Sequence, residues 1–173
     1  MSRQDGTEMK LKSNADRRRV LIGLSAGAAV PVLAACGTSP AQAKDFPIQL
    51  SEAEWRRRLT KDEFYILREA GTERSFTSPL NDEKRDGTYH CAGCDNLIYS
   101  SETKYESGTG WPAFYRAEPN AVGTSVDYKL GFPRTEVHCA DCGGHLGHIF
   151  GDGPPPTGKR HCINGIAMDF KPA

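Results

Sequence analysis

The chain has 173 residues, a length that favours one globular domain with an accessory segment. Its 22 Lys and Arg residues balance its 22 Asp and Glu residues, and no basic stripe runs along the sequence. This composition excludes a surface built to bind a polyanion, so we expect no nucleic-acid partner.

The first 36 residues have the three parts of an export signal. A basic stretch ends at residues 17–19 (Arg-Arg-Arg), an apolar run follows over 20–33, and Leu-Ala-Ala-Cys closes the segment at 33–36. The apolar run is too short for a good transmembrane helix, which needs about 20 residues. The sequence therefore predicts a signal peptide over 1–36, with an uncleaved anchor helix as the alternative.

Two short motifs indicate the route of export. Arg-Arg-x-Val-Leu at 17–21 resembles the twin-arginine motif, and Leu-Ala-Ala-Cys resembles a bacterial lipobox, in which Cys36 would be acylated. Residues 37–48 are small and polar, as expected of a flexible tether. We therefore expect a membrane-anchored lipoprotein in the periplasm or another extracytoplasmic space, with its folded domain over 49–173.

Two helices are predicted at the start of this domain, over 52–59 and 61–70. Each is preceded by a capping box, in which a Ser or Thr is followed three residues later by Glu: Ser51 with Glu54, and Thr60 with Glu63.

Beyond residue 71 the pattern changes, because Gly and Pro become frequent and the apolar stretches shorten to strand length. We expect strands over 87–91, 96–100, 121–130, 134–139, 145–150 and 160–170. The sequence thus predicts a mainly β, antiparallel domain with short N-terminal helices.

Four of the six cysteines form two Cys-x-x-Cys pairs, Cys91 with Cys94 and Cys139 with Cys142. Two such pairs complete the tetrahedral thiolate shell that Zn²⁺ prefers, and four thiolates leave the metal no open position. The sequence therefore predicts one structural zinc that clamps two distant parts of the sheet. Disulfides or a redox motif are the alternatives in an oxidising compartment.

Cys162 is the remaining cysteine of the domain and a candidate nucleophile. A free thiol has a pKa of about 8.5, and cationic neighbours lower it. Arg160 and His161 flank the thiol in the sequence and are expected to act in this way. A buried structural cysteine is the alternative.

Two histidines, His145 and His148, lie three residues apart shortly after the second Cys-x-x-Cys pair, and Asp152 follows them. Such a pair is compatible with a metal site or with ordinary core histidines. A third possibility is that the cysteine knuckle positions them toward Cys162.

The sequence resembles the peptide-methionine (R)-S-oxide reductases (MsrB family) over roughly residues 50–172. The resemblance rests on Cys91-x-x-Cys94, 107–114 (Ser-Gly-Thr-Gly-Trp-Pro-Ala-Phe), Cys139-x-x-Cys142, 145–150 (His-Leu-Gly-His-Ile-Phe), 152–154 (Asp-Gly-Pro), 156–158 (Pro-Thr-Gly) and 160–164 (Arg-His-Cys-Ile-Asn). It implies two antiparallel β-sheets with N-terminal helices, and a zinc site away from the active site.

The resemblance also assigns the catalytic group. Cys162 would attack the sulfoxide sulfur, release methionine and become a sulfenic acid. His148 and His145 would supply the proton to the sulfoxide oxygen, and Asp152 would orient or bias an imidazole.

Four further residues complete the expected site. Arg160 would hold the thiolate charge, and Asn164 would contribute hydrogen bonds. Trp111 and Phe150 would form an apolar wall for the S-methyl group, because aromatic rings contact sulfur-bearing side chains favourably. An ordinary core position is the alternative for Trp111.

The sequence departs from the family at two positions. Thr109 stands where many relatives carry a cysteine that resolves the sulfenic acid, so we expect a one-cysteine cycle with an external thiol reductant, thioredoxin-like or other. His161 stands where an aromatic residue is common. The expected substrates are oxidised proteins or free methionine sulfoxide, the expected role is repair after oxidative damage, and we expect a monomer.

Two rival functions fit parts of the same pattern. A zinc-stabilised binding module would need a basic or aromatic binding face, but not a cysteine, two histidines and an arginine together. A Cys/His hydrolase would also pair a thiolate with an imidazole, but would not reduce methionine R-sulfoxide.

Overall fold

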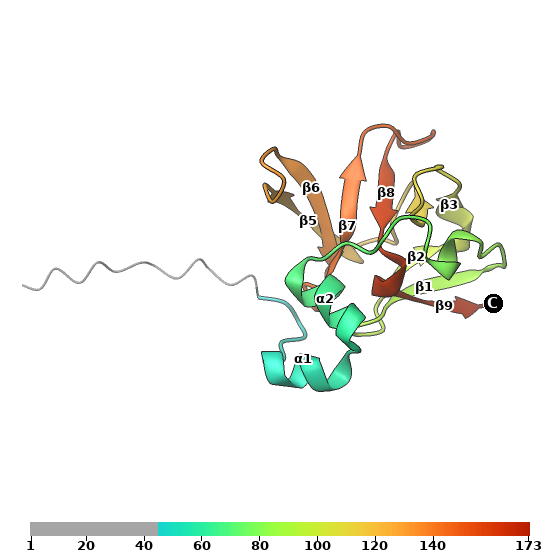
Figure 1. Cartoon of the computed structure of the whole chain (residues 1–173). Helices are drawn as coiled ribbons and strands as arrows, with labels where there is room; N and C mark the ends of the chain where they lie inside the picture. Colours follow the sequence, from blue (N-terminus) through green and yellow to red (C-terminus); the bar gives the residue numbers. More distant parts are fainter. Residues whose placement is uncertain (1–44) are drawn as a thin grey trace, which may run out of the picture. The chain divides into compact units, whose positions relative to one another are not determined.

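The computed structural model describes residues 45–173 (Figure 1). The twin-arginine motif, Cys36 and most of the predicted tether lie outside the described residues. Phe46 packs edge-on against His138, with ring centroids 5.6 Å apart, and the Ile48 amide donates to the carbonyl of Asp141. These contacts tie residues 46–48 to the chain around the second Cys-x-x-Cys pair.

The two predicted helices are confirmed as α1 (Glu52–Arg58) and α2 (Lys61–Glu69), and both capping boxes form. Trp55 of α1 is buried, as are Phe64, Ile66 and Leu67 of α2. Helix α2 ends at Ala70, which adopts a left-handed backbone conformation. Its apolar face packs against β7 (His145–Phe150), so the helices close one side of the strands that carry the candidate site.

All strand pairs are antiparallel and form two sheets, as expected. The smaller sheet has the order β2-β1-β9, from Leu97–Ser100, Gly87–Cys91 and Met168–Pro172. The larger sheet has the order β3-β4-β8-β7-β6-β5, from Lys104–Tyr105, Ala113–Phe114, Arg160–Ile163, His145–Phe150, Arg134–Cys139 and Val122–Asp127. Short 3-10 helices lie at Pro79–Asn81 (η1), Ser101–Thr103 (η2) and Gly165–Ala167 (η3).

The single strand expected over 160–170 is wrong in one respect, because η3 divides it into β8 and β9, which belong to different sheets. The buried carboxylate of Glu73 accepts hydrogen bonds from the amides of Gly165 and Ile166 and so fixes this turn. The two-residue strands β3 and β4 were not predicted, since they are too short to show an alternating pattern.

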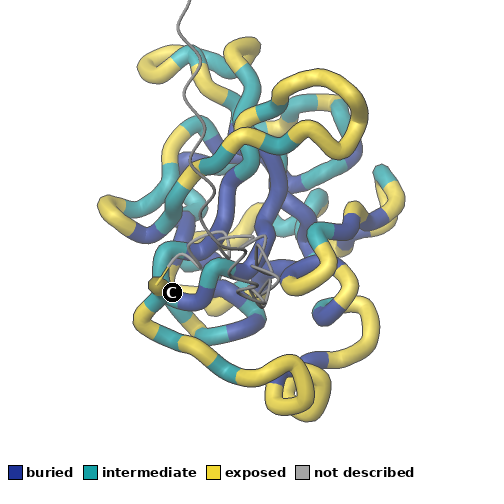
Figure 2. Tube along the Cα trace, turned by 90° about the vertical axis from the view of Figure 1, so that its left-hand side faces the viewer, coloured by how far each residue is buried: buried dark blue, intermediate teal, exposed yellow. Residues whose placement is uncertain are grey.

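The core lies where the helices meet the two sheets, and the exposed chain lies in the loops and on the outer side of α1 (Figure 2). Tyr99 of the smaller sheet stacks on Phe114 of the larger sheet with ring centroids 4.3 Å apart, and Tyr89 meets the same Phe114 edge-on. These rings join the sheets and set the position of β8, which pairs with β4. Within residues 45–173, no helix is both long enough and apolar enough to cross a membrane.

Candidate active site

Cys162 lies directly opposite His148 on the neighbouring strands β8 and β7. Residues opposite one another in an antiparallel pair present their side chains to the same face of the sheet. Both side chains line a pocket with a volume of about 120 Å³. The other lining residues are Thr72, Trp111, Arg134, Gly147, Phe150 and Asn164. The fold thus brings together Cys162, His148, Trp111, Phe150 and Asn164, which are distant in sequence.

The close approach of β7 and β8 depends on Gly147 at the base of this pocket. A Cβ atom at this position would collide with the carbonyl oxygen of Cys162 on the adjacent strand. Only glycine therefore lets the two strands pair here without displacing Cys162.

The surroundings of the Cys162 thiol differ from the sequence expectation. Burial raises the pKa of the Cys162 thiol, and this effect exceeds the opposing effects of the Thr109 hydroxyl and of Arg160. The hydroxyl oxygen of Thr109 lies 3.9 Å from the Cys162 sulfur. In the absence of substrate, the thiol form of Cys162 therefore predominates at neutral pH.

The expectation that His161 acts as a cationic neighbour is wrong. Successive residues of a strand point to opposite faces, and the buried ring of His161 hydrogen-bonds through Nδ1 to the Tyr99 hydroxyl at 3.1 Å. Burial lowers the pKa of His161 to about 4. This imidazole is therefore neutral at physiological pH and belongs to the core between the sheets.

The expectation that Asp152 contacts an imidazole is also wrong. Both of its carboxylate oxygens accept hydrogen bonds from Arg160, each at 2.9 Å. The Arg160 guanidinium in turn lies 4.4 Å from the centroid of the Phe150 ring. Asp152 follows the end of β7 in an exposed loop, so its carboxylate reaches the start of β8 and fixes Arg160 beside the pocket.

The carboxylate that contacts His148 is Asp127, at the end of β5, which the sequence pattern did not identify. Its Oδ2 atom lies 2.7 Å from His148 Nε2 and 2.5 Å from Arg134. A hydrogen bond from the Lys129 amide, followed by the contacts with His148 and Arg134, holds the pKa of Asp127 well below its usual value. An ionised carboxylate only accepts hydrogen bonds, so His148 Nε2 carries the proton.

His148 itself is neutral at neutral pH. Burial lowers the pKa of its imidazole and exceeds the opposing effect of the Asp127 carboxylate. With the proton on Nε2, the Nδ1 atom of this ring is unprotonated and can accept a proton. The structure therefore presents a neutral base across from the Cys162 thiol.

A second carboxylate, Glu136 of β6, holds His145, the other predicted histidine. The Glu136 carboxylate lies 2.8 Å from His145 Nδ1 and 3.8 Å from His138, and it also accepts a hydrogen bond from the Ser125 hydroxyl. The ring of His145 meets that of His148 with centroids 5.3 Å apart. The hydrogen bond with His145 is the main cause that lowers the pKa of Glu136 to about 2.

We expect Glu136→Gln to lower the stability of the protein at neutral pH by about 2 kcal/mol and to flatten its dependence on acid. The pKa of Glu136 falls on folding from 4.5 to about 2, so its stabilisation is complete above pH 4.5 and is lost as the pH falls towards 2. Urea midpoints at pH 7 and pH 3.5 measure this difference. Glu52→Gln is the control, because Glu52 forms only an exposed ion pair with Arg56; equal acid sensitivity in wild type and Glu136→Gln would contradict the prediction.

Asn164 and Trp111 are held by the segment that follows α2. The side-chain amide of Asn164 donates to the carbonyl of Leu146 at 3.0 Å and accepts from the amide of Glu73 at 2.9 Å. The indole nitrogen of Trp111 donates to the carbonyl of Glu73 at 3.1 Å. The main chain of Glu73 thus connects the indole of Trp111 to Asn164, the residue after β8. The hydrogen bonds of the Asn164 side chain are made within the protein.

The four knuckle cysteines form a compact cluster outside this pocket, with their sulfur atoms all within 4.8 Å of one another. Cys91 and Cys142 lie 3.7 Å apart, and Cys94 and Cys139 lie 3.5 Å apart. Four sulfurs at about 2.3 Å from one Zn²⁺ ion are about 3.8 Å from each other, so the cluster fits a tetrahedral metal site. Within residues 45–173, none of the five cysteines forms a disulfide.

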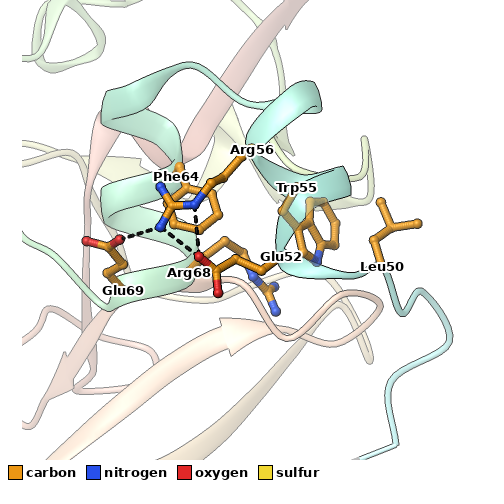
Figure 3. A pocket seen from close by; sticks show the side chains of 7 residues that line it. All are labelled: Leu50, Glu52, Trp55, Arg56, Phe64, Arg68 and Glu69. Carbon is orange, nitrogen blue, oxygen red and sulfur yellow. Dashed lines mark hydrogen bonds and ion pairs between the residues drawn. The ribbon is translucent and has the colours of Figure 1, made fainter.

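A larger pocket, of about 280 Å³, lies between α1 and α2 (Figure 3). Arg56 stacks on Phe64 at 3.9 Å and pairs with Glu52 and Glu69, as the dashed lines in Figure 3 show. Its lining contains no thiol, imidazole or other nucleophile. We therefore assign the chemistry to the smaller pocket around Cys162.

Comparison with known proteins agrees with this assignment. The family model of the SelR domain matches residues 59–172. The peptide methionine sulfoxide reductase MsrB of Agrobacterium fabrum is 50% identical over 126 residues, which cover 72% of this chain and 93% of that protein. The protein of the same name from Pseudomonas putida is 52% identical over 120 residues (69% and 90%), and the mitochondrial methionine-R-sulfoxide reductase B2 of rat is 46% identical over 134 residues (73% and 77%).

Proposed function

The chain belongs to the family of peptide-methionine (R)-S-oxide reductases, and we propose that it reduces methionine R-sulfoxide with Cys162 as the nucleophile. The observation that carries this proposal is the pairing of Cys162 with His148 in a small pocket that Trp111 and Phe150 wall. A half-buried thiol opposite a neutral imidazole, beside an aromatic surface for a thioether, suits attack on a sulfoxide sulfur.

In the first step the Cys162 sulfur attacks the sulfoxide sulfur while its proton passes to the imidazole of His148. The sulfoxide oxygen takes that proton and becomes a hydroxyl. The hydroxyl then moves to the Cys162 sulfur, while its bond to the substrate sulfur and the transient bond between the two sulfur atoms both break. A thiol and a sulfoxide thus give a sulfenic acid and a thioether, so Cys162 is oxidised by two electrons and the substrate is reduced by two.

Asp127 supports this proton transfer from the far side of the ring. When His148 carries the additional proton, the ionised carboxylate 2.7 Å from Nε2 stabilises the resulting imidazolium. Arg134 holds the carboxylate in place on its other side. In this proposal Asp127, and not Asp152, orients the imidazole of His148. Asp152 instead holds the guanidinium of Arg160 in place.

The remaining residues bind the substrate and hold charge. Trp111 and Phe150 contact the S-methyl group, and Arg160 stabilises negative charge that develops on the Cys162 sulfur. His145 does not line the pocket, but its ring lies against that of His148 and supports the position of that imidazole. Asn164 fixes the pocket wall through its bonds to β7 and to Glu73.

The sulfenic acid is reduced by an external thiol, thioredoxin-like or smaller. The first reductant sulfur attacks the Cys162 sulfur, water leaves and a mixed disulfide forms. A second thiol then releases the Cys162 thiol and leaves the reductant as a disulfide. Among the described residues the other four cysteines form the knuckle cluster, and residue 109 contributes a hydroxyl to Cys162.

The experiment that tests the function measures reduction of the two epimers separately, with dithiothreitol as the thiol donor. We expect turnover of N-acetylmethionine R-sulfoxide and of a peptide that contains it, and no turnover of the S epimer. Preference for the S epimer, or hydrolysis of a thioester in place of sulfoxide reduction, would refute the proposal.

The single-cysteine cycle predicts a specific gain in Thr109→Cys. A sulfur in place of a hydroxyl 3.9 Å from Cys162 needs only a small movement of the loop to form a disulfide. After one turnover without reductant, we expect labelling of the sulfenic acid by dimedone to fall by about tenfold or more, because the neighbouring thiol reacts first. Mass spectrometry shows the linkage as the loss of two hydrogens. Thr109→Ser is the control, and undiminished dimedone labelling in Thr109→Cys would argue against this geometry.

We further propose that the knuckle cluster holds one structural zinc ion. Cys91, Cys94, Cys139 and Cys142 would hold it as thiolates, and their close packing at the ends of β1 and β6 supports this assignment. With all four positions taken by sulfur, the metal serves the fold, and the reaction uses only the residues of the Cys162 pocket.

Export and lipid anchoring through Cys36 are also part of the proposal, on the strength of the twin-arginine and lipobox motifs. Expression of the full chain followed by cell fractionation and intact mass measurement tests them. We expect a membrane-bound form cleaved before Cys36 and carrying acyl chains, and a soluble, unacylated form in Cys36→Ala. A full-length, cytoplasmic wild-type product would refute this part of the proposal.

A further inference from the structure

The pocket around Cys162 is too small for a peptide. Pockets that enclose a drug-sized ligand have volumes of about 300–1,000 Å³, whereas this one has about 120 Å³. It therefore holds one side chain, and the main chain and neighbouring residues of a polypeptide substrate must lie on the surface around its mouth.

That surface carries exposed apolar side chains on two sides. Phe76 follows α2 and is 73% exposed, and the loop between β5 and β6 presents Tyr128, Leu130 and Phe132 at 66%, 61% and 55% exposure. Large apolar side chains gathered in this way on a soluble domain mark an interaction surface. We call these four residues the apolar rim.

Phe76 lies beside the Trp111 wall of the pocket. Its amide donates to the carbonyl of Gly110 at 2.7 Å, and its ring lies against Gly110, the residue before Trp111. Phe76 also has a φ of 64°, which is costly for an aromatic residue. A strained backbone that exposes a large ring beside a candidate active site points to a functional use of that ring.

The β5–β6 loop lies beside the His148 wall. Asp127, immediately before the loop, bonds to His148, and Arg134, immediately after it, lines the pocket. The ammonium of Lys129 donates to the carbonyl of Ala70 at 2.9 Å, which ties the loop to the end of α2. Figure 1 shows this hairpin next to β7. The loop is therefore fixed relative to the pocket.

The charges that flank the β5–β6 loop are paired within the protein. Asp127 pairs with Arg134, and Lys129 is bound to main-chain carbonyls. This side of the rim consequently offers mainly apolar area to a ligand. On the other side, Phe76 presents its ring two residues after the exposed Arg74. The rim therefore flanks, on two sides, a site that takes a single side chain.

We propose that the apolar rim binds apolar side chains next to methionine sulfoxide in an extended polypeptide, and so determines which oxidised sites the enzyme prefers. This inference rests on the proposed function, because the rim is defined by the Cys162 pocket. The favoured substrate class is therefore a polypeptide in which the residues next to methionine sulfoxide are apolar.

The test compares three substrates of the full-length enzyme with dithiothreitol as reductant. They are N-acetylmethionine R-sulfoxide and two blocked pentapeptides, Gly-Leu-Met(R-O)-Leu-Gly and Gly-Ser-Met(R-O)-Ser-Gly. We expect kcat/KM for the leucine peptide to exceed that for the serine peptide by about tenfold, from apolar burial on the rim.

Two rim variants and one control complete the test. In Phe76→Asn, asparagine keeps the left-handed backbone that phenylalanine occupies at a cost; the second variant combines Tyr128→Ser, Leu130→Ser and Phe132→Ser. Both should reduce the preference for leucine to less than about threefold, and leave activity on N-acetylmethionine R-sulfoxide unchanged. Leu97→Ser, an exposed leucine on β2 of the other sheet, should behave as wild type.

The possible failures are distinguishable. An enzyme inactive on all three substrates would refute the proposed function. An active enzyme without a preference for leucine, or rim variants that retain it, would refute the inference alone. The triple variant could also keep the preference for the leucine peptide but lose the binding to phosphatidylglycerol vesicles that the wild type shows. That result would refute the inference and make the loop a membrane contact.

Discussion

We expect Cys162→Ser to lower kcat/KM for methionine R-sulfoxide by at least about a thousandfold, because the proposed nucleophile and its base act as a unit. An alcohol at this position keeps the shape of the pocket, but its oxygen is a far weaker nucleophile toward sulfur and cannot form a sulfenic acid. Steady-state reduction with dithiothreitol measures the loss, and the missing dimedone adduct on residue 162 identifies its cause.

The fold provides the control for this result. Cys162 is half-buried and outside the knuckle cluster, so Cys162→Ser should retain the melting temperature and metal content of the wild type. If Cys162→Ser kept a substantial part of the activity, the nucleophile would have to be sought elsewhere and the proposed mechanism would fail.

At Cys139, replacement with serine should affect the fold and not only the reaction. We expect Cys139→Ser to lose the metal and to fail to fold stably. Structural zinc binding contributes about 10–16 kcal/mol in small zinc domains, which is as large as the whole usual domain stability of about 5–15 kcal/mol. Cys139 ends β6 and is fully buried among the other three thiols, so a serine there leaves an incomplete metal shell inside the core. Zinc content and a circular dichroism melt measure both losses.

Chelation tests the same site without a substitution. Prolonged treatment of the wild type with a strong chelator should release one zinc ion per chain and lower the melting temperature, and added zinc should restore it. A metal-free wild type that melts normally, or thiol titration that finds the knuckle cysteines joined as disulfides, would contradict the zinc assignment.

The parts of the fold that the sequence predicted well have local causes. The two capping boxes define α1 and α2, and the strand at 134–139 ends at a cysteine knuckle that turns the chain. The division of the last predicted strand was missed, because Glu73, about ninety residues earlier in the chain, binds the amide of Gly165. Such a contact is absent from any local pattern.

The same distinction applies to the site. Motifs drew attention to Cys162 and His148, which the structure places opposite one another, but not to the carboxylate that contacts His148. Asp127 reaches His148 only through the packing of β5 beside β6 and of β6 beside β7, and this arrangement depends on long-range strand register. Asp152 is nearer in sequence but bonds to Arg160.

The electrostatic expectation for Cys162 failed for a related reason. His161 is adjacent in sequence, but alternation along β8 turns its ring to the other face of the sheet, where burial keeps it neutral. Burial of the thiol itself then outweighs the remaining charge of Arg160 and raises the pKa of Cys162. The order of charged residues in the sequence shows neither the direction in which His161 points nor the burial of the Cys162 thiol.

The position of Thr109 has a consequence for the reductant in the proposed cycle. Its side chain lies next to the Cys162 sulfur, in the same loop as the pocket residue Trp111. With a hydroxyl at residue 109, the external thiol has to reach the Cys162 sulfenic acid inside the pocket. A cysteine there would give it a disulfide to reduce, while the electrons would still come from outside. Residue 109 therefore determines which oxidised form of the enzyme the electron donor must recognise.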